Sequence, residues 1–299
     1  MQRINLNGFE AFTQTNESVL RRFPRLRQFI QEEWNHLSSA SLMEGSHSPG
    51  ILLLQSICEL GHLKHPFSQL HLLEFYLEKF AHLPNGRQKM ITMLRRSAPN
   101  ENDAIVQERS FLAEATAARV LVEKLQLRVS GFDRRSSRAT GGADCDIEAM
   151  SNGTSLFFEV KAKSSQQKHQ SEVISKYLGR CNLFTPDGDE DIAAWLFQRE
   201  SFGKDRERKR PQIEEAERKG ADYLMALVPQ WKAWDSSTPP MQRFIHERMV
   251  CEQIGEHSFA SKDAQLGSEV TGLILFAPLG DYFVIENLNV SRHVARISV

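Results

Sequence analysis

The stretch DCDIEAMSNGTSLFFEVKAK, residues 144–163, carries two runs of strand-forming residues on either side of an Asn-Gly pair. Asn-Gly between two such runs is the strongest short signal for a β-hairpin, because both central residues of a type I′ turn need a positive φ. If Asn152 and Gly153 form the turn, the pairing that continues outward places Asp146 directly opposite Glu159. The turn therefore predicts the register of the whole hairpin.

Side chains alternate between the two faces of a strand, so this register sorts the hairpin residues into two sets. The apolar face carries Cys145, Ile147, Phe158, Val160 and Ala162, and the charged face carries Asp144, Asp146, Glu159, Lys161 and Lys163. Two carboxylates that face each other repel, which favours a compensating divalent cation. Mg²⁺ takes oxygen ligands, commonly one or two carboxylates together with substrate phosphates. Beside such a metal, Lys161 would orient a water or stabilise charge on a phosphate.

A second reading of the hairpin remains open at this point. Strands that are polar on one side and apolar on the other also form solvent-exposed sheet faces, where charges pair across strands. Salt bridges of that kind would favour an Asp opposite a Lys at each position, whereas Asp146 faces Glu159. The like-charged pair therefore favours a metal site over a solvated face.

A long helix, expected at about 104–127, supplies a further carboxylate. Glu114 lies on the same helical stripe as Phe111, Ala118 and Leu121, which predicts that it faces the sheet and not solvent. A buried Glu needs a partner or a metal. Glu108 lies on a similar face about one and a half turns earlier and is a weaker candidate for the same role. The alternative for Glu114 is a surface position on an Ala-rich helix.

The periodicity of apolar residues divides the chain into a helical part and a mixed part. Helical spacing predicts helices at 17–37, 48–63, 67–83 and 87–96, with Pro24 as a start or kink. After the long helix the period changes to two, and strands are expected at 127–132, 144–150, 155–163, 223–228, 270–277 and 281–288. Further helices are expected at 164–182, 191–200 and 240–255. We place a domain boundary in the polar break at 98–103, which gives regions 1–100 and 101–299.

The composition is that of an ordinary soluble protein. The chain has 299 residues, a hydrophobic fraction of 40% and a formal net charge of −1, so any nucleic-acid binding must come from a local patch. Four widely spaced cysteines without a CxxC pair predict reduced thiols: Cys58, Cys145, Cys181 and Cys251. Every apolar stretch is shorter than the roughly 20 residues of a membrane helix. We therefore expect a cytoplasmic protein without a membrane partner.

These residues together resemble the PD-(D/E)xK nuclease superfamily, whose signature is an Asp followed across a hairpin by Glu-x-Lys, after a helix that often bears Glu. Asp146 matches the Asp, residues 159–161 match Glu-x-Lys, and Glu114 matches the helix Glu. The resemblance covers roughly residues 104–230, and the first hundred residues match nothing in it. Cys145 stands where the superfamily's name has Pro, a position that varies widely among its members.

The resemblance implies a fold and a chemistry. The fold would be α/β with a mixed sheet, a restriction-endonuclease-like α-β-β-β-α-β core preceded by an all-α N-terminal region. The chemistry would be phosphodiester hydrolysis with Mg²⁺ or Mn²⁺. Asp146, Glu159 and the carbonyl of Val160 would be metal ligands, and Lys161 would be the catalytic lysine with Glu114 beside it in the catalytic set.

Basic and amide side chains near the hairpin are candidates for contact with nucleic acid. Arg134, Arg135 and Arg138 lie in a Gly-containing loop before the hairpin, where they could hold a phosphate backbone, and Lys163 could extend this rim. Some branches of the superfamily carry a DNA-contacting Gln or Lys at the start of the next helix. Three residues stand at this position and the sequence does not choose among them, although we take Gln170 as the candidate contact: Gln166, Gln167 and Gln170.

The expected function is a metal-dependent DNA endonuclease that acts on double-stranded DNA, in a bacterial defence or restriction-like system by analogy. The helical region 1–100 would serve substrate or partner binding. Two alternatives stay open: an RNase with the same site, and a catalytically inactive nuclease-fold subunit that binds nucleic acid or assembles with other proteins. Because one site cuts one strand, a homodimer or a partner motor protein is expected.

Overall fold

A computed structural model describes residues 8–42, 47–60, 68–123, 125–134, 145–151, 153–164, 211–212, 214, 218, 222–230 and 273–275. The chain forms two compact units. The first unit consists of Met1–Ala115 together with Ser130–Asp133, and the second consists of Thr116–Val129 together with Arg134–Val299. One helix and one strand therefore carry residues of both units.

The first unit is built from helices. Their bounds are α1 Phe9–Thr15, α2 Glu17–Leu20, α3 Pro24–Leu42, α4 Pro49–Leu60, α5 Ser68–Phe80, α6 Gly86–Arg95 and α7 Glu101–Glu123. The helix predicted at 17–37 is divided, because Pro24 begins α3 and a turn separates it from α2. Helix α1 was not predicted. Helix α7 begins three residues before the predicted start, since Asn100 accepts a hydrogen bond from the backbone N–H of Asp103 through its side chain.

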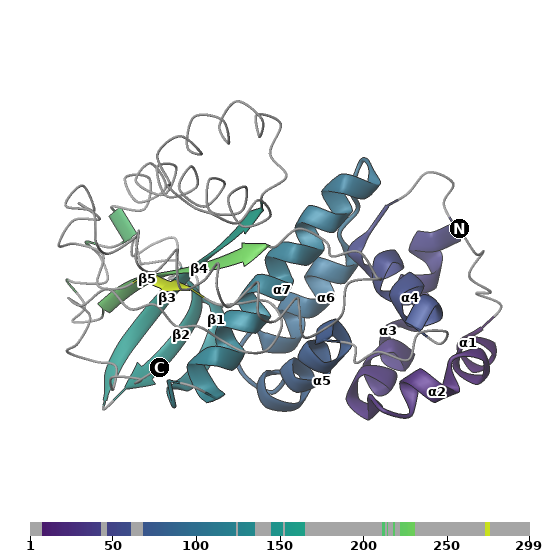
Figure 1. Ribbon diagram of the computed structural model, residues 1–299, viewed down its shortest axis with the longest axis horizontal. Helices are drawn as coiled ribbons and strands as arrows, with labels where there is room; N and C mark the ends of the chain where they lie inside the picture. Colours follow the sequence, from purple (N-terminus) through teal and green to yellow (C-terminus); the bar gives the residue numbers. More distant parts are fainter. Residues whose placement is uncertain are drawn as a thin grey trace, which may run out of the picture. The chain divides into compact units, whose positions relative to one another are not determined.

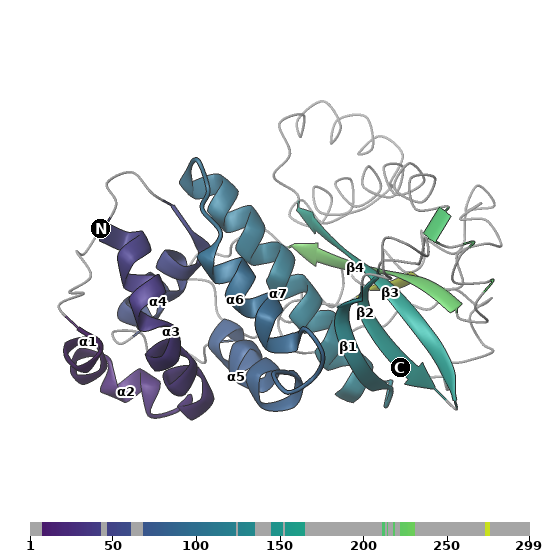
Figure 2. The ribbon, with the colours of Figure 1, turned by 180° about the vertical axis from the view of Figure 1, so that it is seen from behind.

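Helix α3 lies at the centre of the helical packing and contacts α4, α5 and α6. The buried apolar residues of α3 follow the helical period: Leu26, Phe29, Ile30, Trp34 and Leu37. Glu33 on the same helix is also buried. At its start, the carboxylate of Glu74 on α5 accepts hydrogen bonds from the backbone N–H groups of Arg25 and Leu26, at 2.9 and 2.8 Å. An anion at a helix N-terminus stabilises the helix. Helix α6 lies beside α7 in both views (Figure 1 and Figure 2).

The strands form one mixed sheet. Their bounds are β1 Arg128–Arg134, β2 Cys145–Ser151, β3 Thr154–Ser164, β4 Asp222–Gln230 and β5 Leu273–Leu275, and their order in the sheet is β1-β2-β3-β4-β5. Strands β2 and β3 are antiparallel, whereas β3–β4 and β4–β5 are parallel. Figure 2 shows β2 and β3 side by side. The expected α/β class with a mixed sheet is therefore confirmed.

The β2–β3 hairpin has the register that its Asn-Gly pair predicts. Ser151 pairs with Thr154, and the pairing continues in step to Ile147 opposite Phe158. Gly153 has φ 85°, the positive value that the turn requires. The apolar face is buried as expected: Cys145, Ile147, Ala149, Leu156, Phe158 and Val160.

Several predicted elements lie outside the described residues. These are the helices at 164–182, 191–200 and 240–255 and the strand at 281–288. Among the helices that are described, none combines the length and the apolar character needed to cross a membrane.

Candidate functional site

Asp146 is anchored to the neighbouring strand through its side chain. It lies on β2 and is half-buried, and its Oδ2 accepts a hydrogen bond of 2.7 Å from the backbone N–H of Val160 on β3. In a regular strand the N–H and the C=O of one residue point to the same side. The carbonyl of Val160 therefore lies on the same edge of β3 as the carboxylate of Asp146.

Glu159 is buried although it belongs to the charged face. Glu159 is 4% exposed, and Glu148, on the same face of the neighbouring strand, is 8% exposed. A solvated sheet face would leave such carboxylates in water, so the alternative reading of the hairpin is wrong at these two positions. Burial of a carboxylate is costly unless a hydrogen-bonding or cationic partner compensates it. The carboxylates of Glu148 and Glu159 therefore lie where an uncompensated negative charge is unfavourable.

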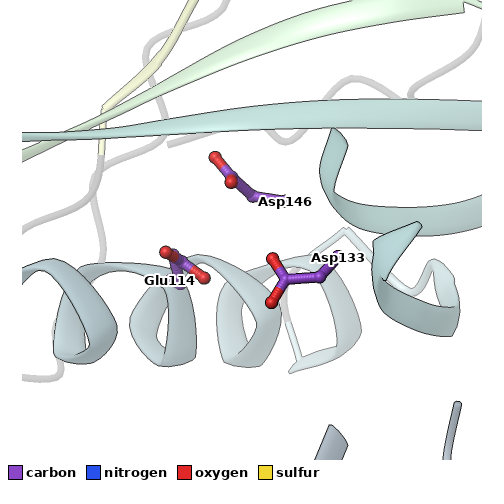
Figure 3. A group of neighbouring side chains, drawn as sticks. All are labelled: Glu114, Asp133 and Asp146. Atoms are coloured by element: carbon purple, nitrogen blue, oxygen red, sulfur yellow. The ribbon is translucent and has the colours of Figure 1, made fainter. Parts of the chain in front are cut away.

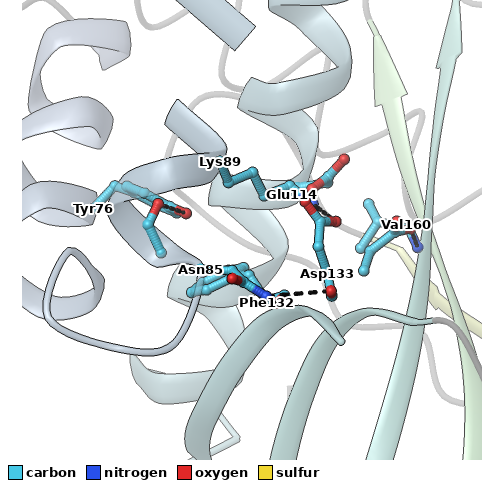
Figure 4. Close-up of polar contacts among 9 residues, drawn as sticks. Tyr76, Asn85, Lys89, Glu114, Phe132, Asp133 and Val160 are labelled. Carbon is cyan, nitrogen blue, oxygen red and sulfur yellow. Dashed lines mark hydrogen bonds and ion pairs between the residues drawn. The ribbon is translucent and has the colours of Figure 1, made fainter. Parts of the chain in front are cut away.

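Glu114 has a partner that the sequence pattern did not indicate. Its side chain is 15% exposed, so it lies largely out of solvent as the helical stripe predicts. Lys89 on α6 forms an ion pair with Glu114, and its Nζ also lies 2.5 Å from Oδ1 of Asp133 on β1. The Lys89 side chain is itself only 10% exposed. One ammonium therefore serves two carboxylates in the first unit (Figure 4).

Glu114 and Asp133 lie close together. One carboxylate oxygen of each lies within 4.8 Å of the other, as the neighbouring side chains in Figure 3 illustrate. Oxygen atoms at such a separation repel when both groups are ionised, and the Lys89 ammonium offsets that repulsion. Asp146, also drawn in Figure 3, belongs to the second unit. Its pairing with Glu114 in one site stays a prediction.

Asp133 was missed by sequence reasoning because it stands in GFDRR, where the charged residues read as the start of a loop. In the structure it lies in β1 with a left-handed backbone, φ 42°. Asn85, at the start of α6, also has a positive φ of 61°. Both residue types tolerate this region better than most, which is the one local signal that could have marked them.

The end of β1 is attached to the start of α6 by three hydrogen bonds. Asn85 Nδ2 donates to the carbonyls of Phe132 and Asp133, at 2.9 and 3.3 Å, and the N–H of Phe132 donates to the carbonyl of Pro84 at 3.1 Å. Asn85 precedes Lys89 by one helical turn, and their backbones are linked by a 2.8 Å hydrogen bond. The segment that carries Lys89 is thus fixed to the segment that carries Asp133 (Figure 4).

Tyr76 is a buried residue whose pKa responds to the charges of Glu114 and Asp133. Its hydroxyl donates a hydrogen bond of 2.9 Å to the carbonyl of Gly86, and its ring contacts those of Phe111 and Phe132. Burial raises the pKa of Tyr76 well above its usual range, and the negative charges of Glu114 and Asp133 raise it further. The surroundings of these two carboxylates are therefore apolar on one side, which strengthens their interaction with Lys89.

Glu108, the alternative to Glu114, has a different environment. Burial raises the pKa of Glu108 to about 7, and the neighbouring Arg109 acts in the opposite direction. Its carboxyl group is thus partly protonated near neutral pH. This property suits a group of the protein interior better than an ionised carboxylate beside a cation.

No protein-family model, curated protein or solved structure matches the chain.

The remaining predicted site residues are placed only in part. Lys161 lies on β3 opposite Leu227 of β4, Lys163 lies opposite Pro229, and Arg134 ends β1. The side chains of these three residues are outside the described part of the chain. Arg135, Arg138 and Gln170 are wholly outside it. Their roles stay predictions.

Proposed function

We propose that the protein is a metal-dependent nuclease that hydrolyses phosphodiester bonds, with a restriction-endonuclease-like core. The observation that carries this proposal is the hairpin: Glu159 is buried on the face that strand alternation assigns to Asp146 as well, and Asp146 accepts a hydrogen bond from the N–H of Val160. Asp146, Glu159 and Val160 occupy the Asp, Glu and x positions of the Asp…Glu-x-Lys pattern. The burial of Glu159 supports a binding role over a solvated surface.

The donor set suits a hard cation. Asp146 and Glu159 offer carboxylate oxygens, and Val160 offers a carbonyl oxygen on the edge of β3 that faces Asp146. Mg²⁺ and Mn²⁺ prefer oxygen ligands of this kind. When bound, such an ion would act as a Lewis acid that stabilises the charge developing on a phosphate. Asp146, Glu159 and Val160 would hold the ion, and the burial of Glu159 would limit competition from water.

Lys161 and Glu114 complete the proposed catalytic set. Lys161 follows Glu159 by two residues on the same strand face, from which its ammonium would stabilise a negatively charged phosphate or orient the attacking water. Glu114 would supply a further carboxylate from α7. Arg134, Arg135, Arg138, Lys163 and Gln170 would contact the nucleic acid, with double-stranded DNA as the proposed substrate.

The test is a cleavage assay on supercoiled plasmid with Mg²⁺ or Mn²⁺, in parallel with single-stranded DNA and RNA of equal length. Nicked or linear plasmid is the expected product. Glu159→Gln and Lys161→Ala should each lower the rate about 100-fold or more, the usual effect of removing a group that stabilises a transition state. Glu148→Gln is the matched control, because it changes a buried carboxylate of the same face that is not in the proposed set.

The outcomes separate the alternatives. Cleavage that survives both Glu159→Gln and Lys161→Ala would show that the site assignment is wrong. Preference for RNA would favour the RNase. Binding of DNA without cleavage under either metal would favour the inactive nucleic-acid-binding subunit.

A further inference from the structure

Lys89 is a cation from the helical region that sequence reasoning assigned to substrate or partner binding. It lies on α6, within residues 1–100, and its ammonium contacts Glu114 on α7 and Asp133 on β1. All three residues belong to the first unit. The helical region therefore supplies a charged contact to the carboxylate that the proposed function places in the catalytic set.

The Lys89 contact is built into the structure. Surface lysine pairs are weak because both side chains stay hydrated and mobile. Lys89 differs because its side chain is largely buried, and because the chain beneath it is fixed through Asn85 to the carbonyls of Phe132 and Asp133. A desolvated ammonium that loses one carboxylate is left poorly compensated. Lys89 and Glu114 therefore hold each other in place.

We propose that Lys89 is a positioning residue that keeps the Glu114 carboxylate oriented for the reaction. The inference rests on the proposed nuclease function and adds a contribution of residues 1–100 to catalysis. Removing the ammonium would leave two carboxylate oxygens within 4.8 Å of each other without their shared cation. The Glu114 side chain would then turn away from its place, although Glu114 itself is unchanged.

The experiment compares Lys89→Met, which keeps most of the apolar stem, with Lys89→Arg, which keeps the charge. For Lys89→Met we expect kcat to fall by about 10- to 100-fold, the scale seen when a residue that orients a functional group is removed. The KM for plasmid and the Mg²⁺ concentration for half-maximal rate should stay unchanged, because Lys89 touches neither. Lys89→Arg should recover most of the lost rate.

A double-mutant cycle tests whether Lys89 acts through Glu114. In a Glu114→Gln background, Lys89→Met should cause no further loss of kcat. Arg87→Met is the matched control: Arg87 lies on the same helix and pairs with Glu32 and Glu33, away from Glu114. This variant should cleave as the unmodified protein does.

Two readouts do not depend on turnover. Binding of Mn²⁺ measured by calorimetry should be the same for Lys89→Met and the unmodified protein. The unfolding temperatures of the single and double variants should show coupling between Lys89 and Glu114, which confirms the ion pair even if Lys89→Met is less stable.

The inference is overturned if Lys89→Met lowers kcat equally with and without Glu114, or if its loss of rate follows its loss of folded protein. It is also overturned if Lys89→Met cleaves normally while Glu159→Gln does not, a result that leaves the proposed function standing. Normal cleavage by Glu159→Gln and Lys161→Ala would instead overturn the proposed function itself.

Discussion

The backbone N–H of Val160 donates a hydrogen bond of 2.7 Å to the carboxylate of Asp146. The bond joins a side chain of β2 to the main chain of β3, one residue after the buried Glu159. A carboxylate that accepts a backbone N–H is restricted to a small range of orientations, which favours a defined ligand geometry over a mobile surface group. The structural role of the Asp146 carboxylate and its chemical role can therefore be tested separately by two different substitutions.

Asp146→Asn keeps an oxygen that can accept the Val160 N–H and removes the charge, whereas Asp146→Ala removes both. We expect both variants to lose cleavage by about 100-fold or more if Asp146 is a metal ligand. Only Asp146→Ala should also lose stability, by about 1–2 kcal/mol, because the N–H loses its acceptor. Cleavage assays and urea unfolding check the two effects. Full activity of Asp146→Asn would exclude a charged role for this residue.

The raised pKa of Glu108 makes folding stability depend on pH. Its pKa is about 7 in the folded protein and about 4.5 when the chain is unfolded. The folded state therefore holds the proton more tightly, and this contribution to stability is fully present below pH 4.5 and is lost as the pH rises through 7. Glu108→Gln removes the titration. We expect the variant to gain up to about 3 kcal/mol relative to the unmodified protein between pH 4.5 and pH 8.

Urea unfolding of both proteins at pH 5 and pH 8 measures this difference. The stability of the unmodified protein should fall relative to Glu108→Gln on going to the higher pH. A constant difference across the range would mean that Glu108 titrates at the ordinary value for a glutamate.

Asn85 combines a left-handed backbone with two side-chain hydrogen bonds to β1. Asn85→Gly keeps the backbone conformation without strain and loses only the side-chain bonds, which we expect to cost about 1 kcal/mol. Asn85→Ala loses the same bonds and also carries a Cβ in the left-handed region, so it should cost about 2 kcal/mol. Thermal unfolding of the pair measures the difference. Equal stabilities would show that the backbone conformation at Asn85 contributes nothing.

Gly86 lies where two backbone segments meet. A Cβ at this position would overlap the carbonyl oxygen of Phe80, which belongs to the main chain and cannot turn aside. Gly86→Ala should therefore destabilise the protein by about 3 kcal/mol or more. Gly153→Ala is the control, because its Cβ would meet nothing within 4 Å and only the positive φ is strained. We expect about 1 kcal/mol there. Chemical denaturation of both variants decides the order, and similar losses would contradict the close approach at Gly86.

The hairpin is the part of the fold that the sequence predicted best. Asn-Gly requires one turn type, that turn sets the register, and the observed pairs from Ser151–Thr154 to Ile147–Phe158 follow it. Helices α4 to α7 were also predicted to within four residues, because their apolar residues recur at the helical period, whereas the helix predicted at 17–37 is divided between α2 and α3. Local periodicity was sufficient for these elements.

The environment of Glu114 could be predicted only in part. The stripe of α7 indicated that Glu114 is shielded from solvent, but its partner Lys89 stands in RQKMITMLRR, an ordinary amphipathic helix. Nothing in its spacing distinguishes Lys89 from the arginines around it. The ion pair depends on how α6 packs on α7, and such packing is not encoded in any local pattern. The burial of Glu148 and Glu159 is of the same kind, because alternation identifies a face and not what covers it.

The first unit cannot be completed during synthesis until strand β1 has been made. Ser130–Asp133 belong to that unit although they follow the whole of α7, and the ring of Phe132 contacts those of Tyr76 and Phe80. A nascent chain that has emerged from the ribosome only as far as Ala115 still lacks this ring and the main-chain acceptors of Asn85. Domains generally fold as units as they are synthesised. The helices must therefore wait for the first strand of the sheet before their own aromatic core is closed.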